Sequence, residues 1–67
     1  MSVAKVSEIS VTSTLSFEDA IKQGIDRANK TLRNVRSAWV KEQHVRVHKG
    51  SIAEFQVNMM ITFVIDD

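Results

Sequence analysis

The chain has 67 residues, of which 43% are hydrophobic and 25% charged, with nine Lys and Arg against eight Asp and Glu. This composition is typical of a globular domain, and the balanced charge argues against a nucleic-acid-binding protein, which usually carries a clear basic excess. The absence of cysteine excludes disulfides, and because a fold this small needs some additional staple, we expect the chain to self-associate.

The sequence contains no candidate membrane segment. No apolar run approaches the roughly 18–20 residues of a membrane span, and the charged Lys5 and Glu8 interrupt the first ten residues, where a secretory signal would need an apolar core. We therefore expect a single cytoplasmic domain over residues 1–67, with neither a membrane nor a nucleic acid as its partner.

Residues 3–12 predict the first strand, because Val and Ile fit a pleated surface. Their alternation is imperfect: Ile9 and Val11 share one parity, whereas Val6 takes the other. A twist, a bulge or burial of both faces would explain this pattern.

An amphipathic helix is predicted from about Phe17 to about Asn34. Ser16, followed three residues later by Asp19, resembles a helix N-cap. Gly24 lies within the apolar stripe and costs about 1 kcal/mol relative to alanine in a helix, so we expect the sheet or a neighbouring chain to approach closely there. The stripe recurs at steps of three and four residues and consists of Phe17, Ala20, Ile21, Gly24, Ile25, Ala28, Leu32 and Val35.

Two further strands are predicted at 37–47 and 52–65, joined by a hairpin turn in which Gly50 is free to adopt a positive φ. The order strand, helix, strand, strand favours an α+β fold in which an antiparallel sheet packs on one helix. The last strand alternates strictly, and its apolar face carries Phe55, Val57, Met59, Ile61, Phe63 and Ile65.

The predicted strands and helix differ in length. Fourteen extended residues span roughly 46 Å, whereas eighteen helical residues span about 27 Å. Because one helix cannot cover such strands, and because exposed strand is a hazard in a monomer, the chain is expected to form a curved sheet and to bind a partner chain.

No catalytic constellation is evident, so we do not expect an enzyme. The sequence has no glycine-rich phosphate loop and no pairing of a nucleophile with a base. His44 and His48 would lie roughly 13 Å apart on a strand, too far apart to share one metal ion. Asp66 and Asp67 are interpreted as a solvated tail.

Trp39 and Gln56 are the candidate ligand-binding residues. Trp39 is the single tryptophan and has polar neighbours of its own parity, so it either packs against the helix or another subunit, or offers a stacking platform to a flat heteroaromatic ligand. Gln56 lies opposite in phase to the apolar row. Its amide offers two donors and an acceptor, which suits the edge of an isoalloxazine ring.

The sequence resembles the dodecin family over nearly its whole length, about residues 3–66. The segments that carry the resemblance are Ser16–Ile21, Ile25–Ala28, Thr31–Val35 and Phe55–Met59. The resemblance implies a three-stranded antiparallel sheet wrapped around one helix, and twelve copies assembled into a hollow shell.

The resemblance also implies flavin binding, with FMN or riboflavin as the cofactor. In the family, a tryptophan on the second strand stacks on the flavin ring and a glutamine on the third strand contacts its edge. Gln56 matches that glutamine, but the tryptophan position falls on Ser37, and Trp39 lies about 6–7 Å farther along the same strand. Trp39, Gln56 and Ser37 are thus the expected flavin-binding residues, and the alternative is a flavin-free shell with a structural or cation-binding role.

Overall fold

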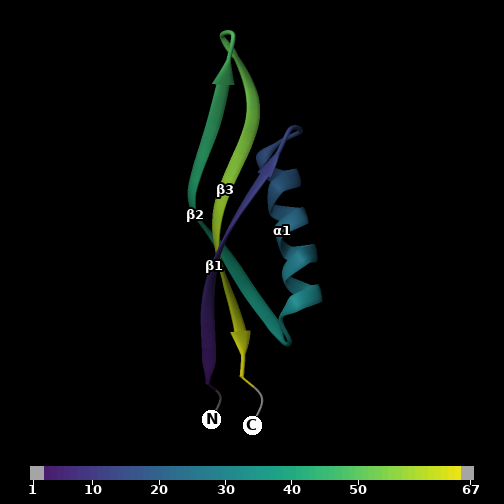
Figure 1. Cartoon of the computed structure of the whole chain (residues 1–67). Helices are drawn as coiled ribbons and strands as arrows, with labels where there is room; N and C mark the ends of the chain where they lie inside the picture. The colour runs from purple at the N-terminus through teal and green to yellow at the C-terminus, as the bar shows by residue number, and fades with distance from the viewer. Residues whose placement is uncertain (1–2, 66–67) are drawn as a thin grey trace.

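One helix lies across one face of a three-stranded antiparallel sheet, in a computed structural model that describes residues 3–65 (Figure 1). The elements follow in the order β1 (Ala4–Ser13), α1 (Phe17–Thr31), β2 (Val35–His48) and β3 (Ser51–Val64). The sheet order is β1-β3-β2, with β3 in the centre and antiparallel to both neighbours. The predicted α+β class and element order are confirmed.

Hydrogen bonds fix the start of α1 where the sequence predicted it. The Ser16 Oγ accepts a hydrogen bond from the backbone N of Asp19 at 2.9 Å, which is the geometry of an N-cap. The buried Ser13 Oγ donates to the Asp19 carboxylate at 2.6 Å. Asp19 is therefore occupied in helix capping.

The helix ends three residues earlier than the predicted Asn34. It stops at Thr31, because Leu32 already has extended backbone angles (φ −117°, ψ 148°). Asn34 then adopts a left-handed φ of 58°, which turns the chain so that Val35 can pair with Phe63 on β3. Leu32 and Val35 continue the apolar periodicity past Thr31 because they also pack against the core, although they lie outside the helix.

The core lies between α1 and the middle of β3. Phe55 and Phe63 belong to the predicted apolar face of this strand, which should be buried under the helix, but they are only half-buried, and Ile65 lies beyond the end of β3 with 45% of its surface exposed. The apolar face of β3 was thus predicted correctly, but its burial reaches only as far as the helix. The buried apolar residues are Ala20, Ala28, Val57, Met59 and Ile61.

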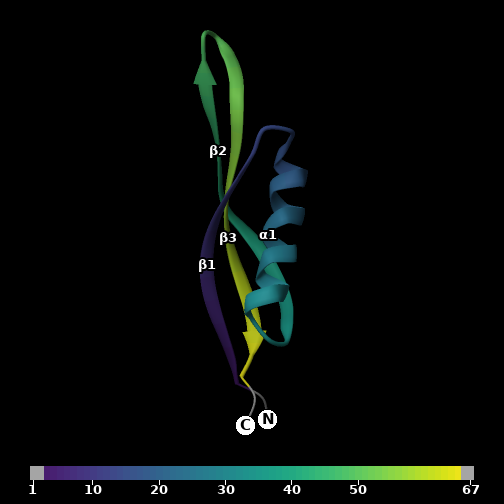
Figure 2. The same ribbon diagram turned by 45° about the vertical axis from the view of Figure 1, so that its right-hand side comes forward.

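The hairpin formed by β2 and β3 extends well past the helix (Figures 1 and 2). The molecule measures 51 × 19 × 13 Å, whereas a 15-residue helix spans only about 22 Å. Val45, Val47 and Ile52 are consequently exposed on the uncovered part of the hairpin.

The hairpin turn is formed by Lys49 and Gly50. Both residues have positive φ, at 51° and 77°, between the paired residues His48 and Ser51. Two consecutive residues of positive φ are the requirement of a type I′ turn, whose twist matches that of the strands. The predicted turn is confirmed.

Gly24 lies at a position where the helix and the sheet are in close contact. A Cβ at this position would lie 2.9 Å from Val11 Cγ2 and 3.1 Å from Met59 Sδ. The predicted close approach of the sheet is confirmed. Within residues 3–65, the single helix is too short and too polar to cross a membrane.

We expect Gly24→Ala to lower the free energy of unfolding even though alanine favours helix formation by about 1 kcal/mol. Overpacking a core costs about 1–3 kcal/mol, and the β-branched Val11 has little rotamer freedom with which to move aside. The matched control is Asn29→Ala on the exposed face of α1, which should gain a few tenths of a kcal/mol. The measurement is thermal unfolding at one protein concentration, and equal stabilisation by both substitutions would contradict the close packing.

Candidate functional site

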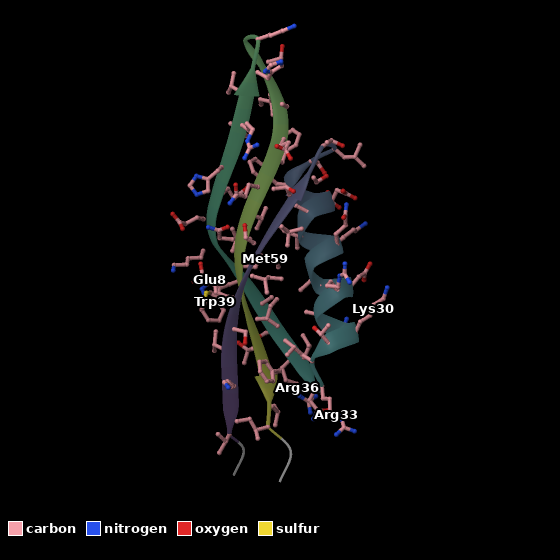
Figure 3. The ribbon with its side chains drawn as sticks, viewed as in Figure 1. Glu8, Lys30, Arg33, Arg36, Trp39 and Met59 are labelled. Carbon is pink, nitrogen blue, oxygen red and sulfur yellow. The ribbon has the colours of Figure 1, made fainter. Side chains whose placement is uncertain are left out.

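Trp39, Gln56 and Ser37 all lie on the sheet face turned away from α1, here called the outer face. Met59 points into the core under α1, so the side chains that alternate with it, including Met60 and Gln56, point away from the helix. Trp39 pairs directly with Met60 across the strands and lies on the side of the sheet away from α1, whereas Met59 lies toward it (Figure 3).

A β-bulge in β2 exchanges the two faces of this strand part-way along. The register shifts between Val40 and Glu42, so residues beyond this point have the opposite parity. Gln43 is one of the polar neighbours that share the parity of Trp39 in the sequence, but it does not share its face, because Gln43 lies opposite the buried Val57. Glu42 and His44 reach the outer face instead, because they pair with Asn58 and Gln56.

The side chain of Trp39 is unusually exposed to solvent for an indole. Half of its surface (51%) is exposed, and its row on the sheet continues through Met60 to Glu8 on β1. The Lys41 Nζ lies 3.3 Å from the Glu8 Oε1 and forms an ion pair at the margin of this row. The indole is therefore available to a planar ligand or to a second copy of the chain.

Gln56 is half-buried and held by neighbouring polar groups. Its Nε2 donates to Ser10 Oγ at 3.1 Å and to Asn58 Oδ1 at 3.3 Å. Thr12 and His44 flank it on the two adjoining strands. Among the hydrogen bonds of residues 3–65, none reaches the Gln56 Oε1, so this oxygen can accept a hydrogen bond from a ligand.

The structure separates the three predicted residues along the outer face. Gln56 and Met60 are four residues apart on β3, so the rows of Gln56 and Trp39 lie about 13 Å apart. Ser37 is exposed and pairs with Thr62, which places its row about 20 Å from Gln56. One chain does not bring these residues together, and a shared site requires a second copy.

The other candidate groups form no site within one chain. Residues 3–65 contain no group of three or more His, Asp or Glu side chains arranged to hold a metal ion. His44 instead lies beside Glu42, with 3.7 Å between Nε2 and Oε2. Asp66 and Asp67 lie outside the described residues.

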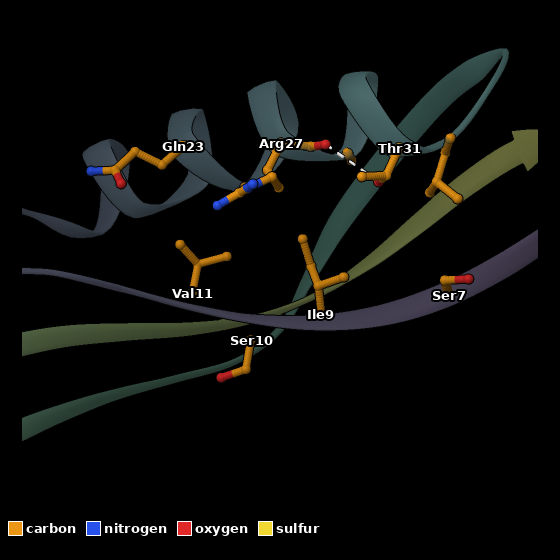
Figure 4. A pocket seen from close by; sticks show the side chains of 10 residues that line it. Ser7, Ile9, Ser10, Val11, Gln23, Arg27 and Thr31 are labelled. Atoms are coloured by element: carbon orange, nitrogen blue, oxygen red, sulfur yellow. Dashed lines mark hydrogen bonds between the residues drawn. The ribbon is translucent and has the colours of Figure 1, made fainter.

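A groove between β1 and α1 was not foreseen from the sequence. It has a volume of 390 Å³, and its walls are the apolar Ile9 and Val11 on β1 and the polar Gln23, Arg27 and Thr31 on α1 (Figure 4). The groove lies on the helix side of the sheet and is therefore separate from the outer face. The only sequence feature related to the groove is the set of small residues in the helix stripe, of which Gly24 and Ala28 line it.

A family model for dodecins matches residues 3–66 of this sequence. The chain belongs to the dodecin family. Dodecins are known as non-enzymatic binding proteins that self-assemble, which agrees with the uncovered apolar side chains of this dodecin.

Solved dodecin structures share this fold closely. The dodecin of Streptomyces davaonensis is 35% identical, with a TM-score of 0.93 and coverage of 98% of this chain and 97% of that one. An arginine mutant of T. thermophilus dodecin is 31% identical, with a TM-score of 0.94 and full coverage of both chains. A calcium dodecin from Mycobacterium tuberculosis, described as calcium-chelating, is 31% identical, with a TM-score of 0.82 and coverage of 96% and 91%. No curated protein sequence matches.

The exposed indole allows a direct test of whether this dodecin covers its outer face on assembly. Because Trp39 is the single tryptophan, all tryptophan fluorescence comes from this site. We expect acrylamide to quench the assembled protein less than the dissociated protomer, in which half of the residue is exposed. Equal quenching in the two states would show that the outer face around Trp39 stays open to solvent.

Proposed function

We propose that this dodecin assembles into a hollow cytoplasmic shell of twelve copies that binds and sequesters flavin, FMN or riboflavin, without chemical turnover. The observation that carries the proposal is that an exposed indole, Trp39, and an amide with an open acceptor, Gln56, share the outer face. A flat heteroaromatic ring with polar edges is the ligand class that uses both groups.

The separation of these residues favours binding between copies. A ring that contacts Gln56 of one copy lies about 13 Å from the Trp39 of that copy. Two-fold symmetry across the outer face would bring the indole of a second copy to the same ring. Stacking on an aromatic side chain contributes roughly 1–3 kcal/mol per ring, enough to decide whether binding is tight.

Assembly has its own support in the surface of the protomer. Val6 and Trp39 are exposed on the sheet, and Val45, Val47 and Ile52 on the overhanging hairpin. Apolar residues gathered along long strands favour association, because an uncovered strand offers a template for pairing.

We expect sedimentation at micromolar concentration to give a mass near twelve times the 7.6 kDa of one chain. The physical reason is that one helix leaves about half the length of each 14-residue strand uncovered, so the isolated protomer lacks a sufficient core. A stable monomer in this measurement would contradict the assembly.

Titration with FMN and riboflavin, followed by quenching of flavin fluorescence, tests the ligand. Trp39→Ala and Gln56→Ala should each weaken binding, with loss of stacking costing about one to two decades in affinity. Ser37→Trp restores an aromatic ring at the stacking position that the family resemblance implies, and it should tighten binding.

Lys30→Ala on the far side of α1 is the matched control and should bind like the wild type (Figure 3). Equal affinity in all variants would mean that flavin binds away from the outer face. If none of the variants binds flavin, the flavin-free alternative is favoured.

The second candidate is a flavin-free shell with a structural or cation-binding role. It is favoured by Ser37, which cannot stack on a ring, at the position where the resemblance implies tryptophan. A calcium dodecin among the similar structures is consistent with it. Because residues 3–65 of one chain hold no metal-binding group, a cation would need side chains from several copies.

A further inference from the structure

A chain of polar side chains crosses the outer face from β2 to β1. The Asn58 Nδ2 donates to the Glu42 Oε1 at 3.3 Å. The Asn58 Oδ1 accepts from the Gln56 Nε2 at 3.3 Å, and the same nitrogen donates to the Ser10 Oγ at 3.1 Å. The four residues thus form one connected series, from Glu42 to Ser10, that includes the candidate ligand-binding amide of Gln56.

This series has a direction, which the carboxylate of Glu42 sets. An ionised carboxylate only accepts hydrogen bonds, so the Asn58 amide must turn its nitrogen toward Glu42 and its oxygen toward Gln56. Gln56 must in turn direct its nitrogen toward Asn58. Ser10 does not influence the choice, because a hydroxyl can donate or accept.

We propose that Glu42 and Asn58 are positioning residues that fix the Gln56 amide with its oxygen toward the ligand. Gln56 then acts only as an acceptor and selects a ring edge that presents an N–H donor. In a flavin, that donor is the N3–H of the pyrimidine ring. This inference rests on the proposed function, because it assigns the part of the flavin that Gln56 recognises.

The consequence is selectivity against a ring that lacks this donor. A site built to hydrogen-bond a ligand N–H leaves its own acceptor unpaired when the donor is missing, and it rejects such an analogue. If the Gln56 amide were free to turn over, it could present either its oxygen or its nitrogen to the ligand, and most of this selectivity would disappear.

The test compares riboflavin with 3-methylriboflavin, which has no N3–H, by fluorescence titration of the assembled protein. We expect wild type to bind the methylated ring about tenfold more weakly or worse. Asn58→Ala removes the group that orients Gln56 and should bring the ratio of the two dissociation constants toward one. Glu42→Gln should do the same, because a glutamine amide can face Asn58 with either end.

Two variants serve as matched controls. Asn58→Asp keeps an oxygen toward Gln56 and should retain the wild-type ratio, even if repulsion from Glu42 lowers overall stability. Ser10→Ala should also retain it, because the serine does not choose the orientation. Assembly mass and melting temperature, measured for every variant, separate positioning from loss of the fold.

The outcomes are distinct for the two proposals. A ratio that stays high in Asn58→Ala and Glu42→Gln would show that the methyl group is excluded by its size, and would overturn the positioning role. If wild type binds no riboflavin, flavin binding is refuted, and hydrogen exchange of the Gln56 side-chain NH₂, followed by NMR, tests the positioning alone. Exchange should be faster in Asn58→Ala than in wild type or Asn58→Asp, and equal rates would overturn it.

Discussion

A helix of 15 residues spans about 22 Å, whereas the 14-residue strands that it must cover span about 46 Å. The core therefore forms only at the middle of β3, where Val57, Met59 and Ile61 are buried. The helix covers neither the overhanging hairpin nor the outer face, so both remain available for contacts with other molecules. The tendency to self-associate and the uncovered outer face both follow from this difference in length.

The β-bulge in β2 decides which side chains the outer face presents. A shift of one residue moves every later side chain of a strand to the opposite face. Without the bulge, Lys41 would lie opposite Asn58, and Glu42 would lie opposite Val57 and point toward the helix side. With it, a carboxylate lies next to Asn58 at 3.3 Å, and the row of Gln56 ends in His44. The polar chain that orients Gln56 thus depends on a local irregularity of the sheet.

The fold alone does not decide what a dodecin binds. The same architecture occurs in the Streptomyces davaonensis dodecin and in a calcium dodecin, and function resides in the side chains placed on a shared frame. In this chain those side chains are Trp39, Ser37 and Gln56. Trp39 lies two residues from the tryptophan position implied by the resemblance, Ser37 occupies that position, and Gln56 is hydrogen-bonded to Asn58. These three positions separate the flavin-binding proposal from the flavin-free alternative.

Local and periodic features were predictable from the sequence by itself. The N-cap at Ser16, the turn at Gly50, the alternation of β3 and the close approach at Gly24 each depend on a few neighbouring residues or on one period, so the α+β class and the face of Gln56 followed. The end of α1, the bulge before Glu42, the 13 Å between the rows of Trp39 and Gln56 and the orientation of the Gln56 amide did not follow. Each of these depends on pairing between strands or on hydrogen bonds between residues distant in the sequence, and only the tertiary structure decides which partners meet.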